Sequence, residues 1–237
     1  MAFTFFFRDA QTLDLAIQHA LPALSGQAFI HVWDAGCAHG PEPYTLAILL
    51  RQHMSAVLFR NVRIHATDLD PQFGPQVTSG VFPGEELRRI PAEVFQRYFR
   101  PADRPGCFQV VEEIRSRIAF ARHDLLSLMP IRENLSLIVC KNVLLHFDER
   151  QRCDVLRMFH GALRKDGLLV MENTQKVHEA LQPLLEQAVP HAQVYRKIES
   201  PACATRRWDT GAAGRVDLSG DRPLPHRGSL PHVLSGR

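Results

Sequence analysis

Residues 33–44 constrain the fold of this chain more than any other stretch. They read Trp-Asp-Ala-Gly-Cys-Ala-His-Gly-Pro-Glu-Pro-Tyr and follow an apolar run, Phe29–Val32, that is typical of a buried strand. A helical pattern begins at Pro41. Proline suits the first position of a helix, where its missing N–H costs no hydrogen bond. A strand, a glycine turn and a helix start together favour a nucleotide-type cofactor site. Glycine lets the backbone approach the ligand, and the helix start offers unpaired N–H groups.

Two acids sharpen this prediction, because the spacing of Gly36 and Gly40 alone is not the dinucleotide-binding pattern. Glu42 lies just inside the predicted helix, and Asp68 follows the next predicted strand, Val62–Thr67. A carboxylate at that strand end can accept hydrogen bonds from both hydroxyls of a ribose. The sequence therefore predicts that the chain binds an adenosyl cofactor.

Strand-like and helix-like segments alternate along the chain, which predicts an α/β fold with a mostly parallel sheet. We expect one domain over residues 1–198 and a disordered tail, rich in Pro, Gly and Arg, over residues 199–237. Further strands are expected at Phe108–Glu112, Ile118–Ala121, Leu135–Cys140, Leu168–Met171 (after a turn at Gly167) and Gln193–Ile198. Helices are expected from Leu13 to a stop at Pro22, after Pro91, after the N-cap Asp148, and around Val177–Ala188.

Composition narrows the possible partners. Six arginines and four acids in the tail account for +2 of the net charge of +3, so the remaining body has a net charge near +1. The body has no run of like charges and therefore lacks the basic stripe that nucleic acid requires. No apolar run approaches the roughly 20 residues that span a bilayer. The five cysteines contain no Cys-x-x-Cys pair, and the histidines do not have the spacing of metal ligands, so we expect no metal site. The scattered cysteines also give no disulfide framework, and we therefore expect a cytoplasmic location.

Several motifs, in order, resemble the CheR-type methyltransferases, which use S-adenosylmethionine to methylate glutamate side chains of bacterial chemoreceptors. Residues 4–9 resemble the Thr-x-Phe-Phe-Arg-Glu/Asp opening of that family, and residues 33–45 its Trp-Ser-Ala-Gly-Cys-Ser-Thr-Gly-Glu-Glu-Pro-Tyr-Ser motif. Residues 66–70 match Ala-Thr-Asp-Ile-Asp, residues 124–126 resemble Asn-Leu-Leu, and residues 140–147 resemble Cys-Arg-Asn-Val-Leu-Ile-Tyr-Phe. The resemblance extends to about Asn173 and implies a Rossmann-like class I methyltransferase fold with a seven-stranded sheet.

The resemblance also implies which residues hold the cofactor, S-adenosylmethionine. Asp124 and Leu125 would lie beside the adenine, and Thr4 and Arg8 would reach both the cofactor and the reaction centre. The full implied set of cofactor-binding residues is Thr4, Arg8, Gly36, Glu42, Asp68, Asp124, Leu125 and Asn142. Arg8 and His146 are the candidate catalytic residues.

The chain also departs from the family pattern, mainly on the substrate side. Asp124 replaces Asn, Lys141 replaces Arg, His146 replaces Tyr, and Pro41 replaces the first Glu of the glycine-rich motif. Residues 172–175 read Glu-Asn-Thr-Gln instead of Gly-His-Ser-Glu, and the N-terminal helical domain of the family has no counterpart. S-adenosylmethionine binding is therefore better supported than a chemoreceptor acceptor.

These departures leave two interpretations open. The first is an O-methyltransferase whose acceptor is a protein glutamate carboxylate or a small-molecule carboxyl or hydroxyl. A carboxylate needs no base and can be oriented by Arg8, whereas a hydroxyl must lose a proton, which His146 can accept. The second is a non-catalytic binding or scaffold module that retains the fold. The sequence leaves the acceptor and the oligomeric state open.

Some of these residues also have a plain structural interpretation. Asp68 can cap a helix, a common role for Asp after a strand. Phe5, Phe6 and Phe7 fit a role as core anchors better than ring contacts to the sulfonium.

Overall fold

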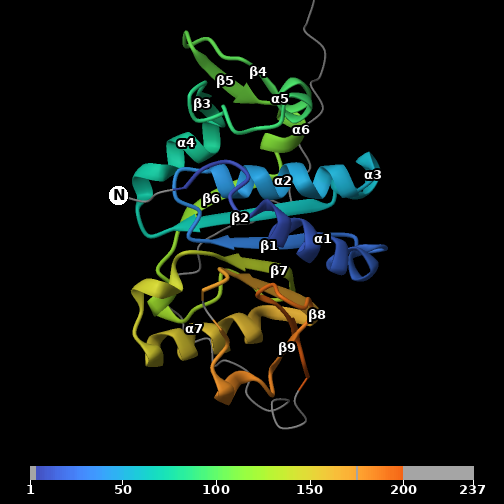
Figure 1. Cartoon of the computed structure of the whole chain (residues 1–237), viewed down its shortest axis with the longest axis vertical. Coiled ribbons are helices and arrows are strands. Elements are labelled where there is room, and N and C mark those ends of the chain that lie inside the picture. The colour runs from blue at the N-terminus through green and yellow to red at the C-terminus, as the bar shows by residue number, and fades with distance from the viewer. Residues whose placement is uncertain (1–3, 175, 200–237) are drawn as a thin grey trace, which may run out of the picture. The chain divides into compact units, whose positions relative to one another are not determined.

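A seven-stranded sheet forms the centre of the protein (Figure 1). The structure, a computed structural model, describes residues 4–174 and 176–199. The strand order is β6-β2-β1-β7-β8-β10-β9, in which β6 to β8 pair in parallel while β10 and β9 are antiparallel. The strands are β1 (Ile30–Ala35), β2 (Val62–Asp68), β6 (Ile118–Arg122), β7 (Leu135–Cys140), β8 (Leu163–Met171), β9 (Leu185–Gln187) and β10 (Val194–Lys197). The predicted α/β fold with a mostly parallel seven-stranded sheet is confirmed.

Helices cover both faces of this sheet because its inner strands are apolar on both sides. In β1, Ile30 and Val32 pack into the cluster that contains α1 (Ala10–Leu24) and α2 (Pro41–His53). The alternate residues Trp33 and Ala35 pack into a second cluster with α7 (Glu149–Ala162). Among the described helices, none is long and apolar enough to cross a membrane.

A small antiparallel sheet, β3-β5-β4, follows β2 in the chain and lies beside α5 (Figure 1). Phe6 packs edge-on against Phe82 and Phe99 of this subdomain, with ring centroids 4.9 and 5.6 Å apart. Phe6 is buried, as expected of a core anchor, and it ties the N-terminal segment to the body.

The remaining elements are α3 (Ala56–Phe59), η1 (Pro71–Phe73), α4 (Gly74–Ser79), β3 (Val81–Pro83), α5 (Ala92–Tyr98), β4 (Phe99–Pro101), β5 (Cys107–Val110), α6 (Glu112–Arg115), η2 (Leu125–Ser127), η3 (Leu144–His146) and η4 (Glu179–Leu181).

Several predicted boundaries are confirmed. Leu135–Cys140 is β7, and every residue in it is buried. Pro41 is the first residue of α2. Asp148 caps α7 by accepting a hydrogen bond from the Gln151 N–H, and the Gln151 side chain accepts one from the Asp148 N–H in return. These segments were predictable because their signals are local.

The predicted helix over Val177–Ala188 is wrong. The structure has the short turn η4 and the edge strand β9 instead. Pro183 lies in the middle of the predicted helix, where it removes a backbone hydrogen bond and clashes with the preceding turn. β9 gains its hydrogen bonds from β10, a pairing with no local sequence signal.

Other boundaries differ by less. Pro22 does not stop α1, which continues to Leu24. Gly167 lies inside β8, next to a shift in its register with β7, so it is not a turn between two elements. The strands predicted on either side of a polar turn, β5 and β6, are separated by α6 and belong to different sheets. The predicted tail lies, apart from Glu199, outside the described residues.

Candidate functional site

The carboxyl ends of β1, β2, β6 and β7 surround a cavity of about 620 Å³. The sheet continues from β1 to β2 on one side and from β1 to β7 on the other, so the cavity lies where the strand order reverses. Ligands of open α/β sheets bind at such points. The volume falls within the range of roughly 300–1,000 Å³ that is usual for small-molecule sites.

All nine site residues predicted from the sequence line this one cavity: Thr4, Arg8, Gly36, Glu42, Asp68, Asp124, Leu125, Asn142 and His146. They come from five separate parts of the chain. Their proximity supports the predicted site, while their individual roles stay predictions. Sequence reasoning did not select the other lining residues, which are Ala38, Thr67, Leu69, His123, Leu126, Lys141, Val143, Leu145 and Phe147.

The glycine turn after β1 requires Gly36 for two reasons. Its φ is +97°, which side chains other than glycine rarely adopt. A Cβ at this position would lie 2.1 Å from Cγ2 of Val143, so the loop after β7 can approach only a glycine. The N–H groups of Gly36 and Cys37 both donate to the Thr67 carbonyl, at 2.8 and 2.9 Å, which fixes the turn against the end of β2.

Asp68 is held by the backbone at the end of β2. Its carboxylate accepts hydrogen bonds from the N–H of Ala38 at 2.9 Å and of Asp70 at 3.1 Å. The helical turn η1 is capped by Asp70, which accepts from Gln72, so the interpretation of Asp68 as the cap is wrong. Each carboxylate oxygen can accept more than one hydrogen bond, and Asp68 therefore has capacity left toward the cavity.

The loops after β6 and β7 are fixed in the same way. Asp124 caps η2 by accepting from the Leu126 N–H at 2.9 Å. Asn142 has a positive φ of 60°, and its N–H donates to the buried Glu172 carboxylate at 3.1 Å. Glu172 is one of the departures from the family pattern, and here it supports the loop that carries Asn142.

Lys141 is the buried centre of a charged cluster. Its ammonium lies 3.3 Å from Glu42 and 3.3 Å from Asp9, and it donates to the Arg8 carbonyl at 3.2 Å. Only 1% of the Lys141 side chain is exposed. Lys141 therefore connects the end of β7 to α2 and to the N-terminal segment that carries Thr4 and Arg8.

Asp34 lies next to this cluster, and sequence reasoning missed it. Burial and the neighbouring Glu42 carboxyl raise the pKa of Asp34 well above its usual range. Burial also raises the pKa of Glu42, while Lys141 opposes that rise. An acid inside a strand predicted to be buried was the only local signal, and the family motif quoted above has Ser at this position.

The mouth of the cavity differs from its walls. Leu69, Leu126 and Leu145 line the cavity and are 57%, 41% and 44% exposed. His146 lies in η3 beside Leu145 and is also exposed. This rim presents apolar surface and an imidazole to solvent.

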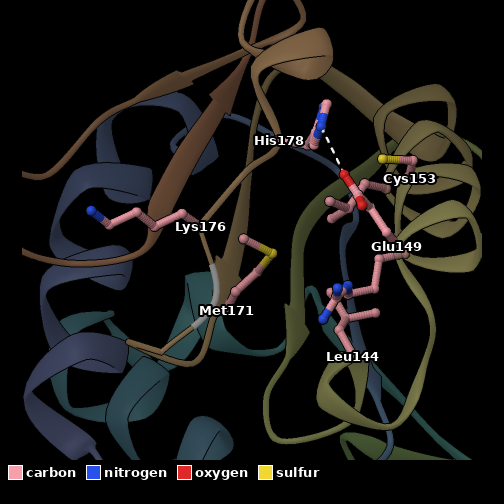
Figure 2. A pocket seen from close by; sticks show the side chains of 8 residues that line it. Leu144, Glu149, Cys153, Met171, Lys176 and His178 are labelled. Atoms are coloured by element: carbon pink, nitrogen blue, oxygen red, sulfur yellow. Dashed lines mark ion pairs between the residues drawn. The ribbon is translucent and has the colours of Figure 1, made fainter.

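A second, smaller pocket of about 160 Å³ lies between α7 and the segment before η4 (Figure 2). Figure 2 shows His178 pointing toward Glu149, with which it forms an ion pair at 3.0 Å, beside Cys153. None of the nine predicted site residues lines this pocket. It is separate from the site that the sequence predicts.

Comparisons with known proteins agree with the motifs. Residues 2–190 match the model of the CheR methyltransferase SAM-binding domain. The chain is similar to the chemotaxis protein methyltransferase of Borreliella burgdorferi, with 30% identity over 183 residues that cover 73% of this chain and 64% of the relative. It is also similar to that of Escherichia coli, with 32% identity over 169 residues that cover 70% of this chain and 58% of the relative. The chain thus spans less than two thirds of the length of these relatives.

Among solved structures, the N-methyltransferase NodS from Bradyrhizobium japonicum aligns with a TM-score of 0.43 and 16% identity. The alignment covers 81% of this chain and 97% of that one.

Proposed function

Because this chain belongs to the CheR methyltransferase family, we propose that it binds S-adenosylmethionine in the 620 Å³ cavity and transfers the methyl group to an oxygen acceptor. The observation that carries the proposal is that residues from five separate motifs converge on one cavity at the switch point of the sheet.

The chemistry of the cavity walls fits this cofactor. Asp68 has acceptor capacity left for the hydroxyls of a ribose. Leu125 on the wall and Leu69 at the mouth supply apolar surface for a flat base. Glu42 and Arg8 offer opposite charges to the ammonium and carboxylate groups of the methionyl part.

When bound, S-adenosylmethionine supplies a methyl group on a sulfonium, which leaves as a neutral thioether. The task of the protein is then to orient the acceptor, and orientation can contribute about 7–11 kcal/mol to a reaction of this type. Arg8 can orient a carboxylate acceptor through a bidentate contact. His146 lies at the mouth, where it can accept the proton of a hydroxyl acceptor.

The acceptor that we favour is a carboxylate of a protein, since the similar relatives are named chemotaxis protein methyltransferases. A small molecule with a carboxyl or hydroxyl group is the second possibility, because His146 replaces the Tyr of the family motif. We propose the cytoplasm as the compartment, in keeping with the free thiols of Cys37, Cys107, Cys140 and Cys153.

The competing proposal is a non-catalytic module that keeps the fold. Calorimetric titration with S-adenosylmethionine and S-adenosylhomocysteine is the first test, because an enzyme must bind the donor and its product. We expect both to bind. Transfer of a radiolabelled methyl group to glutamate-containing proteins, then to small carboxylic acids and alcohols, tests catalysis. Binding without transfer to any of these acceptors would favour the module, and absence of binding would contradict the proposed function.

A further inference from the structure

Asp34 is a buried acid without a conventional partner. It lies in β1 with no exposed surface, and neither carboxylate oxygen receives a hydrogen bond from any donor among the described residues. The nearby ammonium of Lys141 contacts Glu42, Asp9 and the Arg8 carbonyl instead. A buried, ionised carboxylate in this situation would be costly, because nothing replaces the water that it has lost.

The group that faces Asp34 is the Glu42 carboxyl. The two side chains are close enough to hydrogen-bond with each other. Two ionised carboxylates only accept hydrogen bonds, so a bond between them requires that one of them holds a proton. Glu42 has Lys141 at 3.3 Å, whereas Asp34 has no cation within ion-pair distance among the described residues. The proton therefore belongs on Asp34 and the negative charge on Glu42.

We propose that Asp34 is a protonated carboxylic acid that donates a hydrogen bond to the Glu42 carboxylate, and that it thereby acts as a positioning residue for one wall of the cavity. Lys141 and the Asp34 hydroxyl then both contact the Glu42 carboxylate. Two fixed contacts restrict the rotation of the Glu42 carboxylate, which lines the cavity. The positioning role rests on the proposed function, whereas the protonation of Asp34 does not.

The surrounding charges agree with a neutral Asp34. The charged groups that act on it are Glu42 from α2, Asp68 from β2 and Lys141 after β7. With Asp34 neutral, Lys141 pairs with two carboxylates, those of Glu42 and Asp9. With Asp34 ionised, three acids would share one buried lysine.

The first test is infrared spectroscopy of the protein without cofactor, at neutral pH. We expect the carbonyl band of a protonated carboxylic acid in the unmodified protein and its loss in Asp34→Asn. No such band in the unmodified protein, or a band that persists in Asp34→Asn, would overturn the protonation of Asp34. This measurement is independent of cofactor binding, so it stands even where the proposed function fails.

The second test is calorimetric titration with S-adenosylhomocysteine. Asn keeps an N–H donor toward Glu42 but cannot ionise, whereas Leu has a similar size and no donor. We expect Asp34→Asn to bind within about 3-fold of the unmodified protein and Asp34→Leu to bind at least about 10-fold more weakly, the effect of one lost charge-assisted hydrogen bond. Thermal unfolding without ligand should show that both variants are folded.

Equal losses in both variants would overturn the positioning role, because they would show that the charge of Asp34 matters rather than its donor. Wild-type affinity in Asp34→Leu would also overturn it. If the unmodified protein does not bind S-adenosylhomocysteine, the proposed function and the positioning role fail together. The infrared result still shows whether Asp34 is protonated.

Discussion

The walls and the rim of the cavity are built differently. On the walls, Asp68 and Asp124 accept hydrogen bonds from backbone N–H groups, and the N–H of Asn142 donates to Glu172. The buried Lys141 holds Glu42 in place. On the rim, His146 and its apolar neighbours are exposed. Side chains fixed by hydrogen bonds suit a ligand that binds in one orientation, and the exposed rim is the part of the cavity that an acceptor can reach from solvent. The contrast explains why the cofactor was predictable from the sequence and the acceptor was not.

Removing the charge of Lys141 should break the walls most severely. We expect Lys141→Met to lower the free energy of unfolding by about 3–5 kcal/mol, because it removes the ammonium that lies 3.3 Å from the buried Glu42 carboxylate. Chemical denaturation measures this change. Lys165→Met, at an exposed lysine, is the control and should have little effect. If Lys141→Met and Lys165→Met are equally stable, the cluster does not hold the wall.

The glycine turn should show the next largest effect. Gly36→Ala combines an unfavourable φ with a Cβ placed 2.1 Å from Val143, so we expect a loss of about 2–4 kcal/mol in unfolding free energy. Gly26→Ala is a matched control, because Gly26 also has a positive φ, +85°, but open space around its Cβ position. It should cost only about 1–2 kcal/mol, the backbone term alone. Equal losses in the two variants would contradict the close approach of Val143.

Asp68→Asn should weaken cofactor binding without unfolding the protein. The substitution replaces a charged acceptor by an amide, which we expect to lower the affinity for S-adenosylhomocysteine by about 10- to 100-fold. Asp70→Asn is the control, since Asp70 lies two residues away, does not line the cavity, and Asn also caps helices well. Calorimetry on both variants measures the difference. Unchanged affinity in Asp68→Asn would contradict the predicted contact between Asp68 and the ribose.

The stability of the wall should also depend on pH through Asp34. Its pKa is raised in the folded protein by burial, so its neutral form is fully stabilising below about pH 4 and this contribution is lost as the pH rises toward the folded pKa. Asp34→Asn has no such proton to lose. We therefore expect the variant to gain stability relative to the unmodified protein with rising pH, by at most about 1.4 kcal/mol per pH unit. Denaturation curves of both proteins at several pH values measure this change, and a variant that loses stability relative to the unmodified protein as the pH rises would contradict a raised pKa.

The rim should show the smallest and most selective effect. We expect His146→Phe to lower turnover by about 10-fold, the value of one lost hydrogen bond in the transition state, with the affinity for S-adenosylhomocysteine within about 2-fold. His178→Phe, in the separate pocket of Figure 2, is the control and should change neither quantity. Equal losses of turnover and affinity would show that His146 is structural.

The sequence predicted those parts of the fold and site that depend on local backbone chemistry. The turn at Gly36, the first residue of α2 at Pro41 and the cap at Asp148 need only neighbouring residues, and all three are confirmed. The predicted helix over 177–188 failed because β9 is created by its pairing with β10. Asp34 and Lys141 were missed as site residues for a similar reason, since their importance lies in contacts between distant segments.

The central claim is that the cavity at the carboxyl ends of β1, β2, β6 and β7 holds the methyl donor. The most direct measurement is a crystal structure of the protein with S-adenosylhomocysteine bound. The account predicts ligand density between Asp68 and Glu42, with the ribose hydroxyls bonded to Asp68. Density confined to the pocket of Figure 2, or a ligand in the cavity with both carboxylates turned away from it, would contradict the account.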